Sequence, residues 1–382
     1  MMCQPYESPL VRLLMAPAAS PSLTLADWDV LLQQARSNRL LVRVAVCVED
    51  RHLWDQVPIA VHPHLHASLQ LSFKQRRDVL WELRQIHGAL AALDCPLVLL
   101  KGAAYVAADL PAGRGRVFSD IDLMVPESHL AAAEQMLLCA HWIHTTTDPY
   151  DQRYYRRWTH QLPPLRHAFR GSVLDLHHTI VPKTARIALS AERLFTEARA
   201  LPSSSPYLVL APEDMVLHSA VHLFNDGEFS HGLRDLLDLH DLITLFSREA
   251  GFWRRLLTRA ETLDLRRPLS YAFRFLLRVL GAPFRDAPWQ ELAAWLPAHP
   301  ARIAMDSLFD EALSPDHIRH RRILATCADW VLDARGHYLR MPMHLLLPHL
   351  ISKAARRKQD KDGPHRLLPL EKLGEIRENP PF

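Results

Sequence analysis

The chain has 382 residues, of which 48% are hydrophobic and 23% charged, and its formal net charge at pH 7 is +3. These values are ordinary for a globular protein, and so small a net charge does not by itself indicate nucleic-acid binding. The five cysteines are scattered and form no C-x-x-C pair. This excludes a disulfide framework and a structural zinc site and predicts a reducing, cytoplasmic location. No run of 18 uncharged apolar residues occurs, so no transmembrane segment is predicted.

Residues 23–93 have the apolar spacing of helices. Thr24 is a suitable capping residue for the first of them, because its hydroxyl can accept a hydrogen bond from the first turn. The connection before the last helix carries three histidines at alternate positions: His62, His64 and His66. They either bind a metal or face solvent, and the lack of an acidic or Cys partner nearby favours a solvated loop.

Residues 97–100 form a short apolar run with strand character, and a helix is predicted to start after it, over residues 103–108. Lys101 and Gly102 lie at the turn between them. Glycine at such a turn lets backbone N–H groups approach a phosphate, with the helix N-terminus facing the anion. The Lys101 ammonium either touches that phosphate or pairs with a nearby carboxylate.

Acidic and apolar residues alternate over the next strand, predicted within residues 116–125. The two-residue period of a strand places Asp120 and Asp122 on one face, while the apolar residues between them point into the core. Two adjacent carboxylates repel each other unless a cation neutralises them, and hard oxygen ligands suit Mg²⁺ or Mn²⁺. Arg116, in the basic loop before the strand, either holds a triphosphate or orders the acidic strand.

Residues 150–170 are rich in Tyr, Arg, Trp and His, and they either contact a substrate by stacking or form a β-hairpin beside the site. The strand that follows repeats the apolar-acid-apolar pattern around Asp175. If the two acidic strands are neighbours, Asp175 joins Asp120 and Asp122. Three carboxylates could hold two cations on the attacking and leaving oxygens of a phosphoryl displacement. We expect oxygen ligands alone, with no His or Cys at ligand spacing.

At these residues the chain resembles the nucleotidyltransferase superfamily, which has the DNA polymerase β-like fold. It is more closely similar to a bacterial family of uncharacterised nucleotidyltransferases with the pattern L-K-G followed by R-x-x-x-D-x-D-L-x-V. The residues that match are Leu100, Lys101, Gly102, Arg116, Asp120, Asp122, Leu123 and Val125, with the third acid of the superfamily at Asp175. The resemblance is tight over about residues 95–180 and looser over residues 212–281. Ala103 stands where the superfamily often has Ser or Gly, so a serine hydroxyl contact to phosphate is missing.

The resemblance implies transfer of a nucleoside monophosphate from an NTP, for instance ATP, to a hydroxyl, amine or phosphate acceptor. The catalytic and metal-binding residues that it implies are Asp120, Asp122 and Asp175. The nucleotide-binding and phosphate-binding residues that it implies are Lys101, Gly102, Arg116 and Ser119. The cofactor is then Mg²⁺ or Mn²⁺, with the NTP as substrate. The acceptor stays open between a small molecule, a peptide, a protein and tRNA.

The second half of the chain is predicted to be helical. His218 and His222 are four residues apart on one helix face, as in the H-E-x-x-H motif of zinc proteases. Ser219 replaces the glutamate of that motif, so helix packing or a position lining the cleft is favoured over zinc binding. The next helix, over residues 232–246, carries Asp238 in a Leu-x-Asp-Leu pattern similar to the family's second helical region.

We expect an α+β protein in which a small mixed-sheet nucleotidyltransferase core is embedded in a predominantly helical chain. The predicted parts are a helical segment 1–90, the core 91–200, a helical domain 201–350 and a basic polar tail 351–382. Peripheral contact of the tail with an anionic membrane is an alternative to simple docking, which is favoured. Two alternatives to an enzyme are a non-catalytic, antitoxin-like nucleotide-binding regulator and an RNA-binding module. The three intact acids argue against the first, and the modest net charge against the second.

Overall fold

The computed structural model describes residues 8–16, 23–201, 205–315 and 323–346 of the chain. Residues Met1–Met341 form one compact unit, and Pro342–Phe382 form a second. The fold and the site described below belong to the first unit. The predicted basic tail, 351–382, lies outside the described residues, so its proposed docking or membrane contact stays a prediction.

The N-terminal part is helical, as the sequence predicts. Its helices are α1 (Pro9–Met15), α2 (Leu25–Ser37), α3 (Leu41–Asp50), the 3₁₀ helix η2 (Trp54–Gln56) and α4 (His62–Ala89). Thr24 caps α2 through a reciprocal pair of bonds with Asp27, in which each side chain accepts from the other residue's backbone N–H. The apolar faces of these helices, which include Leu31, Val44 and Leu65, are buried in the core of the unit.

The three neighbouring histidines lie in the first turn of α4, so the expectation of a connecting loop is wrong. Pro63 explains the difference, because proline is tolerated in the first turn of a helix, where its missing N–H has no partner to lose. His66 stacks on Trp54 with ring centroids 4.3 Å apart, and His62 meets the same ring edge-on at 5.1 Å. Two of the three imidazoles therefore pack around an indole, which favours a packing role over metal binding.

The helices accompany a seven-stranded mixed sheet, whose strand order is β3-β4-β5-β2-β1-β7-β6. The strands are β1 (Val98–Leu99), β2 (Ile121–Met124), β3 (Trp142–His144), β4 (Leu165–His167), β5 (Val173–His177), β6 (Arg199–Ala200) and β7 (Leu208–Val209). The pairs β2–β5 and β1–β7 are parallel, and the other neighbours are antiparallel. The α+β class and the mixed sheet that the sequence predicts are both confirmed.

Short helices connect the strands: α5 (Lys101–Ala107), η3 (Pro111–Gly113), η4 (Glu127–His129), α6 (Leu130–Cys139), α7 (Pro149–Trp158) and α8 (Glu192–Glu197). The aromatic and basic segment 150–170 therefore begins as a helix and reaches the sheet only at β4. Asp148 explains the helical start, because its carboxylate accepts from the backbone N–H groups of Tyr150 and Asp151.

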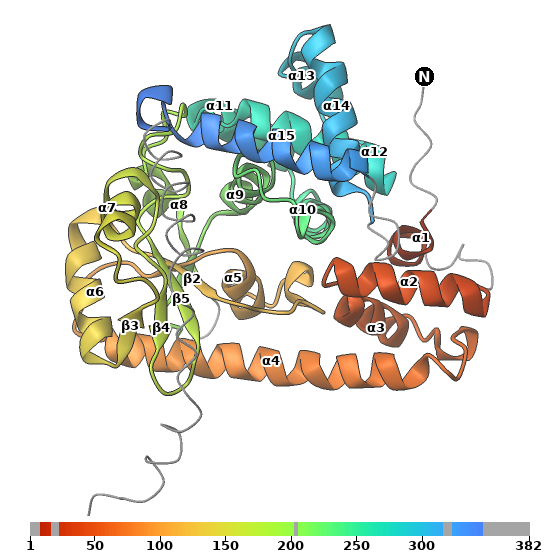
Figure 1. Ribbon diagram of the computed structural model, residues 1–382, viewed down its shortest axis with the longest axis horizontal. Helices are drawn as coiled ribbons and strands as arrows, with labels where there is room; N and C mark the ends of the chain where they lie inside the picture. Colours follow the sequence, from red (N-terminus) through yellow and green to blue (C-terminus); the bar gives the residue numbers. More distant parts are fainter. Residues whose placement is uncertain (1–7, 17–22, 202–204, 316–322, 347–382) are drawn as a thin grey trace, which may run out of the picture. The chain divides into compact units, whose positions relative to one another are not determined.

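The C-terminal helices are α9 (Pro212–Asn225), α10 (Gly232–Phe246), α11 (Phe252–Thr262), α12 (Arg266–Leu280), α13 (Trp289–Ala294), α14 (His299–Leu313) and α15 (Ile323–Arg340). Helix α9 is buried on almost every side, as expected for a helix at the centre of a helical layer. Figure 1 shows α5 between α4 on one side and α9 and α10 on the other. None of the described helices combines the length and the hydropathy that crossing a bilayer requires.

Candidate active site

Two of the three predicted acids meet on neighbouring strands. In the parallel pair of β2 and β5, Asp122 lies directly opposite Asp175. Residues in register on parallel strands point to the same face of the sheet, so the two carboxylates lie side by side. Asp120 precedes the strand and is exposed, and the Ser119 hydroxyl donates to its Oδ1 at 3.0 Å. The structure thus gathers Asp122 and Asp175 inside the protein and leaves Asp120 at the rim.

His177 completes the buried group, although the sequence analysis expects no histidine there. Its Nε2 lies 2.9 Å from Asp122 Oδ1. Among the described residues, one ligand atom each from Asp122, Asp175 and His177 lies within 4.8 Å of the others. The expectation that no histidine lies at ligand spacing is therefore wrong. The two-residue strand period already contained the signal, because it places His177 on the same face as Asp175.

Asp122 is held as a charged carboxylate by its cationic neighbour. Burial by itself would raise its pKa, but the Lys101 ammonium and the hydrogen bond from His177 outweigh burial and lower the pKa below its ordinary range. Lys101 Nζ lies 3.9 Å from Asp122 Oδ1. Burial would likewise lower the pKa of Lys101, and the charge of Asp122 reverses that effect and raises it. The two side chains therefore form a buried ion pair.

Asp175 is in the opposite electrostatic situation. Burial, and next the charge of Asp122, raise its pKa to about 6. Gln161 Nε2 donates to Asp175 Oδ2 at 3.0 Å, while Oδ1 is buried without a hydrogen-bond partner among the described residues. An orphaned carboxylate oxygen beside a second carboxylate is a site that a hard divalent cation fits, because the cation would satisfy the oxygen and offset the repulsion.

The Lys101–Gly102 turn is brought to this centre by the antiparallel pairing of β1 with β2, in which the Leu100 N–H donates to the Asp122 carbonyl at 3.0 Å. A Cβ on Gly102 would lie 2.8 Å from Arg116 Nε and 2.9 Å from Phe118 Cε1. A side chain at this position would therefore displace Arg116 or Phe118. Whether its N–H approaches a phosphate stays a prediction.

Arg116 forms its ion pair with the second helical region. Its guanidinium pairs with Asp238 of α10, which is buried and also accepts from Arg43 Nη1 at 3.2 Å. Arg43 of α3 pairs in addition with Asp241. One carboxylate of α10 thus holds both the loop before the acidic strand and an N-terminal helix. A contact of Arg116 with phosphate stays a prediction beside this observed ion pair.

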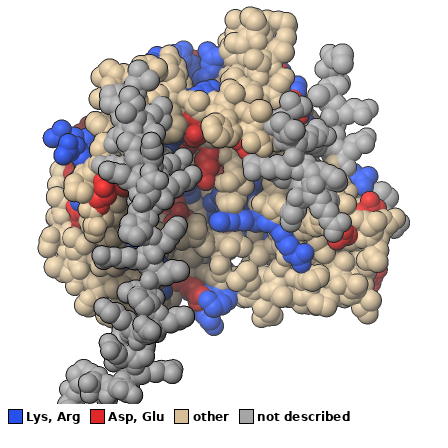
Figure 2. Space-filling view, viewed as in Figure 1, with Lys and Arg blue, Asp and Glu red and all other residues tan. Residues whose placement is uncertain are grey.

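The two histidines of α9 have different surroundings. His218 is buried, and burial together with the Lys101 charge holds its pKa well below the ordinary value, so the ring is neutral. His222 is 34% exposed and lies between two carboxylates, with Nδ1 at 2.8 Å from Asp226 Oδ2 and Nε2 at 3.9 Å from Asp235 Oδ2. Figure 2, which has the same view as Figure 1, shows acidic and basic side chains gathered near the middle of the molecular face that is turned to the viewer.

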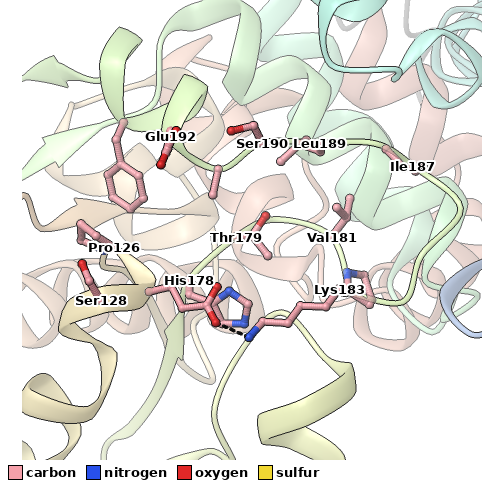
Figure 3. A pocket seen from close by; sticks show the side chains of 14 residues that line it. Pro126, Ser128, His178, Thr179, Val181, Lys183, Ile187, Leu189, Ser190 and Glu192 are labelled. Atoms are coloured by element: carbon pink, nitrogen blue, oxygen red, sulfur yellow. Dashed lines mark hydrogen bonds and ion pairs between the residues drawn. The ribbon is translucent and has the colours of Figure 1, made fainter.

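A cavity of about 630 Å³ lies where β2 and β5 end. Figure 3 shows His178 and Thr179 on one wall, with the ion pair of Glu127 and Lys183 beside them. The Thr179 hydroxyl is buried and has no partner among the described residues. None of the residues predicted to bind metal or nucleotide lines this cavity, so it is separate from the acidic centre.

Comparison with known proteins places these observations among known sequences. A family model described as an uncharacterised nucleotidyltransferase matches residues 24–281, about two thirds of the chain. No curated protein matches the sequence significantly. Among solved structures, the chain is similar to the solution structure of the antibiotic-resistance factor ANT(2'')-Ia, with 15% identity and a TM-score of 0.33. That alignment covers 50% of this chain and 96% of the other.

Proposed function

This chain belongs to the family of uncharacterised nucleotidyltransferases, and on that premise we propose that it transfers a nucleoside monophosphate from an NTP at Asp122 and Asp175. The observation that carries the proposal is the register of β2 and β5, which sets two inward carboxylates side by side. The unpartnered Oδ1 of Asp175 supports a cation-binding role for the pair. The neighbouring Lys101 ammonium supports a place for anionic phosphates there.

Asp122 and Asp175 would hold Mg²⁺ or Mn²⁺, with Asp120 joining them from the rim. The cation would stabilise negative charge on the reacting phosphate oxygens. His177 orients Asp122 by donating to its Oδ1, as hydrogen-bonded neighbours of metal-binding carboxylates commonly do. In the transfer, an acceptor atom bonds to the α-phosphorus of the NTP while the bond to the departing pyrophosphate breaks.

The phosphates would lie against the first turn of α5, which begins at Lys101. We assign their binding to Lys101, Gly102, Arg116 and Ser119. We also propose that the aromatic residues of α7, Tyr155 among them, stack on the nucleobase. The predicted domain ranges and the cytoplasmic location belong to the same proposal.

The alternative from another class is a regulator that binds nucleotide without transferring it. Both buried acids and the lysine turn are in place, which favours an enzyme. The two proposals differ in one measurement, namely whether the α-phosphorus leaves the nucleotide for another molecule.

A transfer assay tests the proposal. The protein is incubated with Mg²⁺ and NTPs labelled at the α-phosphorus in a cell extract, and the extract is fractionated to find the labelled acceptor. We expect Mg²⁺-dependent label in one fraction, lost with Asp175→Asn and kept with Asp94→Asn, an exposed acid before β1. NTP binding without any labelled fraction would favour the regulator, and the absence of NTP binding would contradict both.

A further inference from the structure

His222 of α9 has no part in the proposed nucleotide-binding site. Its hydrogen bond to Asp226 determines which ring nitrogen carries the proton. Burial by itself would raise the pKa of Asp226, but the hydrogen bond and charge of His222 outweigh burial and lower it, so Asp226 is an ionised acceptor. A carboxylate can only accept, so His222 Nδ1 must donate the proton across the 2.8 Å contact. The neutral tautomer that this hydrogen bond selects carries the lone pair on Nε2, on the other side of the ring.

That lone pair faces a second acceptor. Asp235 uses Oδ1 to accept from Arg234 Nε at 2.9 Å and from Arg234 Nη2 at 2.7 Å. Its Oδ2 lies 3.9 Å from His222 Nε2, which is too long for a direct hydrogen bond. Two acceptors at this separation leave a place for a donor that bonds to both. An amine can donate to both acceptors, a hydroxyl can donate its one proton to His222 Nε2, and an ionised phosphate oxygen can donate to neither.

Helix contacts relate His222 to the proposed nucleotide-binding residues. Tyr105 of α5 shares a hydrogen bond of 2.6 Å with Ser219 of α9, so these two helix faces are in contact. Helical spacing places Lys101 on the face of Tyr105 and His222 on the face of Ser219. Lys101 in turn pairs with Asp122. The contact between α5 and α9 thus brings together the two helix faces that carry Lys101 and His222.

The electrostatics agree with this geometry. Although burial opposes it, the pKa of Lys101 is raised by Asp122 and, to a smaller extent, by Asp226 and Asp235. These acids of the helical layer must therefore lie near enough to act on the lysine beside the acidic centre. His222 is also 34% exposed, so a molecule arriving from solvent can reach its ring.

We propose that His222 and Asp235 form the acceptor subsite of this transferase and that the acceptor presents a hydroxyl or an amine, not a phosphate. The inference rests on the proposed nucleotidyl transfer. A hydroxyl or an amine has a proton that it can donate to His222 Nε2, and an ionised phosphate has none. When the acceptor oxygen or nitrogen bonds to the α-phosphorus, its proton passes to His222 Nε2. The bond to pyrophosphate then breaks, and pyrophosphate leaves with the electron pair.

The first test replaces His222 and keeps a matched control. His240 of α10 is also a histidine beside a carboxylate, 3.4 Å from Asp241, and it lies outside the proposed subsite. We expect His222→Asn to bind the non-hydrolysable analogue α,β-methylene-ATP with Mg²⁺ within about twofold of the unsubstituted protein. Its transfer of labelled nucleotide in cell extract should fall by about 100-fold or more, the usual effect of removing a general base. His240→Asn should change neither quantity.

The second test uses the unsubstituted protein, so it does not depend on how a variant folds. The labelled product is exposed to mild acid and to enzymes that cleave phosphoanhydrides. An acid-stable phosphodiester or an acid-labile phosphoramidate is the expected linkage, and a phosphoanhydride would overturn the inference. Equal transfer rates for His222→Asn and the unsubstituted protein would also overturn it. Failure of the unsubstituted protein to bind the analogue or to label anything would instead contradict the proposed function.

Discussion

Replacing Asp175 with Asn should stabilise the metal-free protein while abolishing nucleotide transfer. Burial and the neighbouring charge of Asp122 raise the pKa of Asp175 from 3.8 to about 6. At about 1.36 kcal/mol per pKa unit, ionising this carboxyl costs the folded protein about 3 kcal/mol relative to the unfolded chain. An amide of the same shape removes that cost, so the free energy of unfolding should rise by up to about 3 kcal/mol.

The pH dependence of this gain has a definite sign. Because the folded state holds the Asp175 proton more tightly than the unfolded chain, the carboxyl reduces stability increasingly as pH rises between its two pKa values. The cost is constant above about pH 7 and is under about 1 kcal/mol at pH 4. The stabilising effect of Asp175→Asn should therefore be full at pH 8 and nearly absent at pH 4.

Asp122→Asn should have the opposite effect, although the two acids are neighbours. It removes the partner of Lys101, whose side chain is only 16% exposed, and a buried ion pair broken in this way costs about 3–5 kcal/mol. Asp120→Asn is the matched control, because this exposed acid should change stability by less than about 0.5 kcal/mol. Asp122→Asn, like Asp175→Asn, should lose transfer activity.

Urea unfolding in EDTA at pH 8 and pH 4, followed by circular dichroism, measures these differences, and the labelled-NTP assay measures transfer. Destabilisation of Asp175→Asn at pH 8 would refute the argument that this carboxylate is held at a cost. A gain of equal size at pH 4 would show that the effect does not come from ionisation.

Three further predictions concern the metal and the packing around the site. NTP binding measured by calorimetry should require Mg²⁺ or Mn²⁺, and equal binding in EDTA would contradict the metal role of the acids. Gly102→Ala should lower the free energy of unfolding by about 1–3 kcal/mol, because its Cβ would meet Arg116 at 2.8 Å. Gly88→Ala, with nothing within 4 Å, should instead raise it by about 0.5–1 kcal/mol. Asp238→Asn should lower the free energy of unfolding by at least about 3 kcal/mol, because Arg43 and Arg116 both pair with this carboxylate. If thermal unfolding shows a smaller loss of stability for Asp238→Asn than for Asp241→Asn, the shared carboxylate is not the more important of the two.

The sequence predicts the acidic strands well, because the alternation of apolar and acidic residues repeats every two positions and is visible within a few residues. Apolar residues on either side of Asp122 and Asp175 identify two buried strands with one acid each, and the structure pairs them in register. The fold class follows from the same strands and from the helical spacing around them. The capping residue Thr24 is also correct, because capping depends on residues only three positions apart.

What the sequence leaves undetermined depends on contacts between distant residues. The partner of Arg116 lies on α10, and no local pattern connects that arginine to Asp238. The position of Asp235 beside His222 likewise depends on how α9 packs against α10, whereas Asp226 is a local neighbour four residues after His222. His177 is a different case, because the two-residue period of β5 already places it on the same face as Asp175.

The parallel pairing of β2 with β5 also has a consequence for folding kinetics. His177 and Asp122, which share a hydrogen bond, are 55 positions apart in the chain. Contacts between residues so distant form slowly, because the entropy of closing the intervening segment must be lost before the contact compensates for it. Helices such as α4 need only local contacts and should form early. During refolding from urea, the helical signal should therefore return before the capacity to bind nucleotide, and a chain still leaving the ribosome should lack that capacity until β5 has emerged.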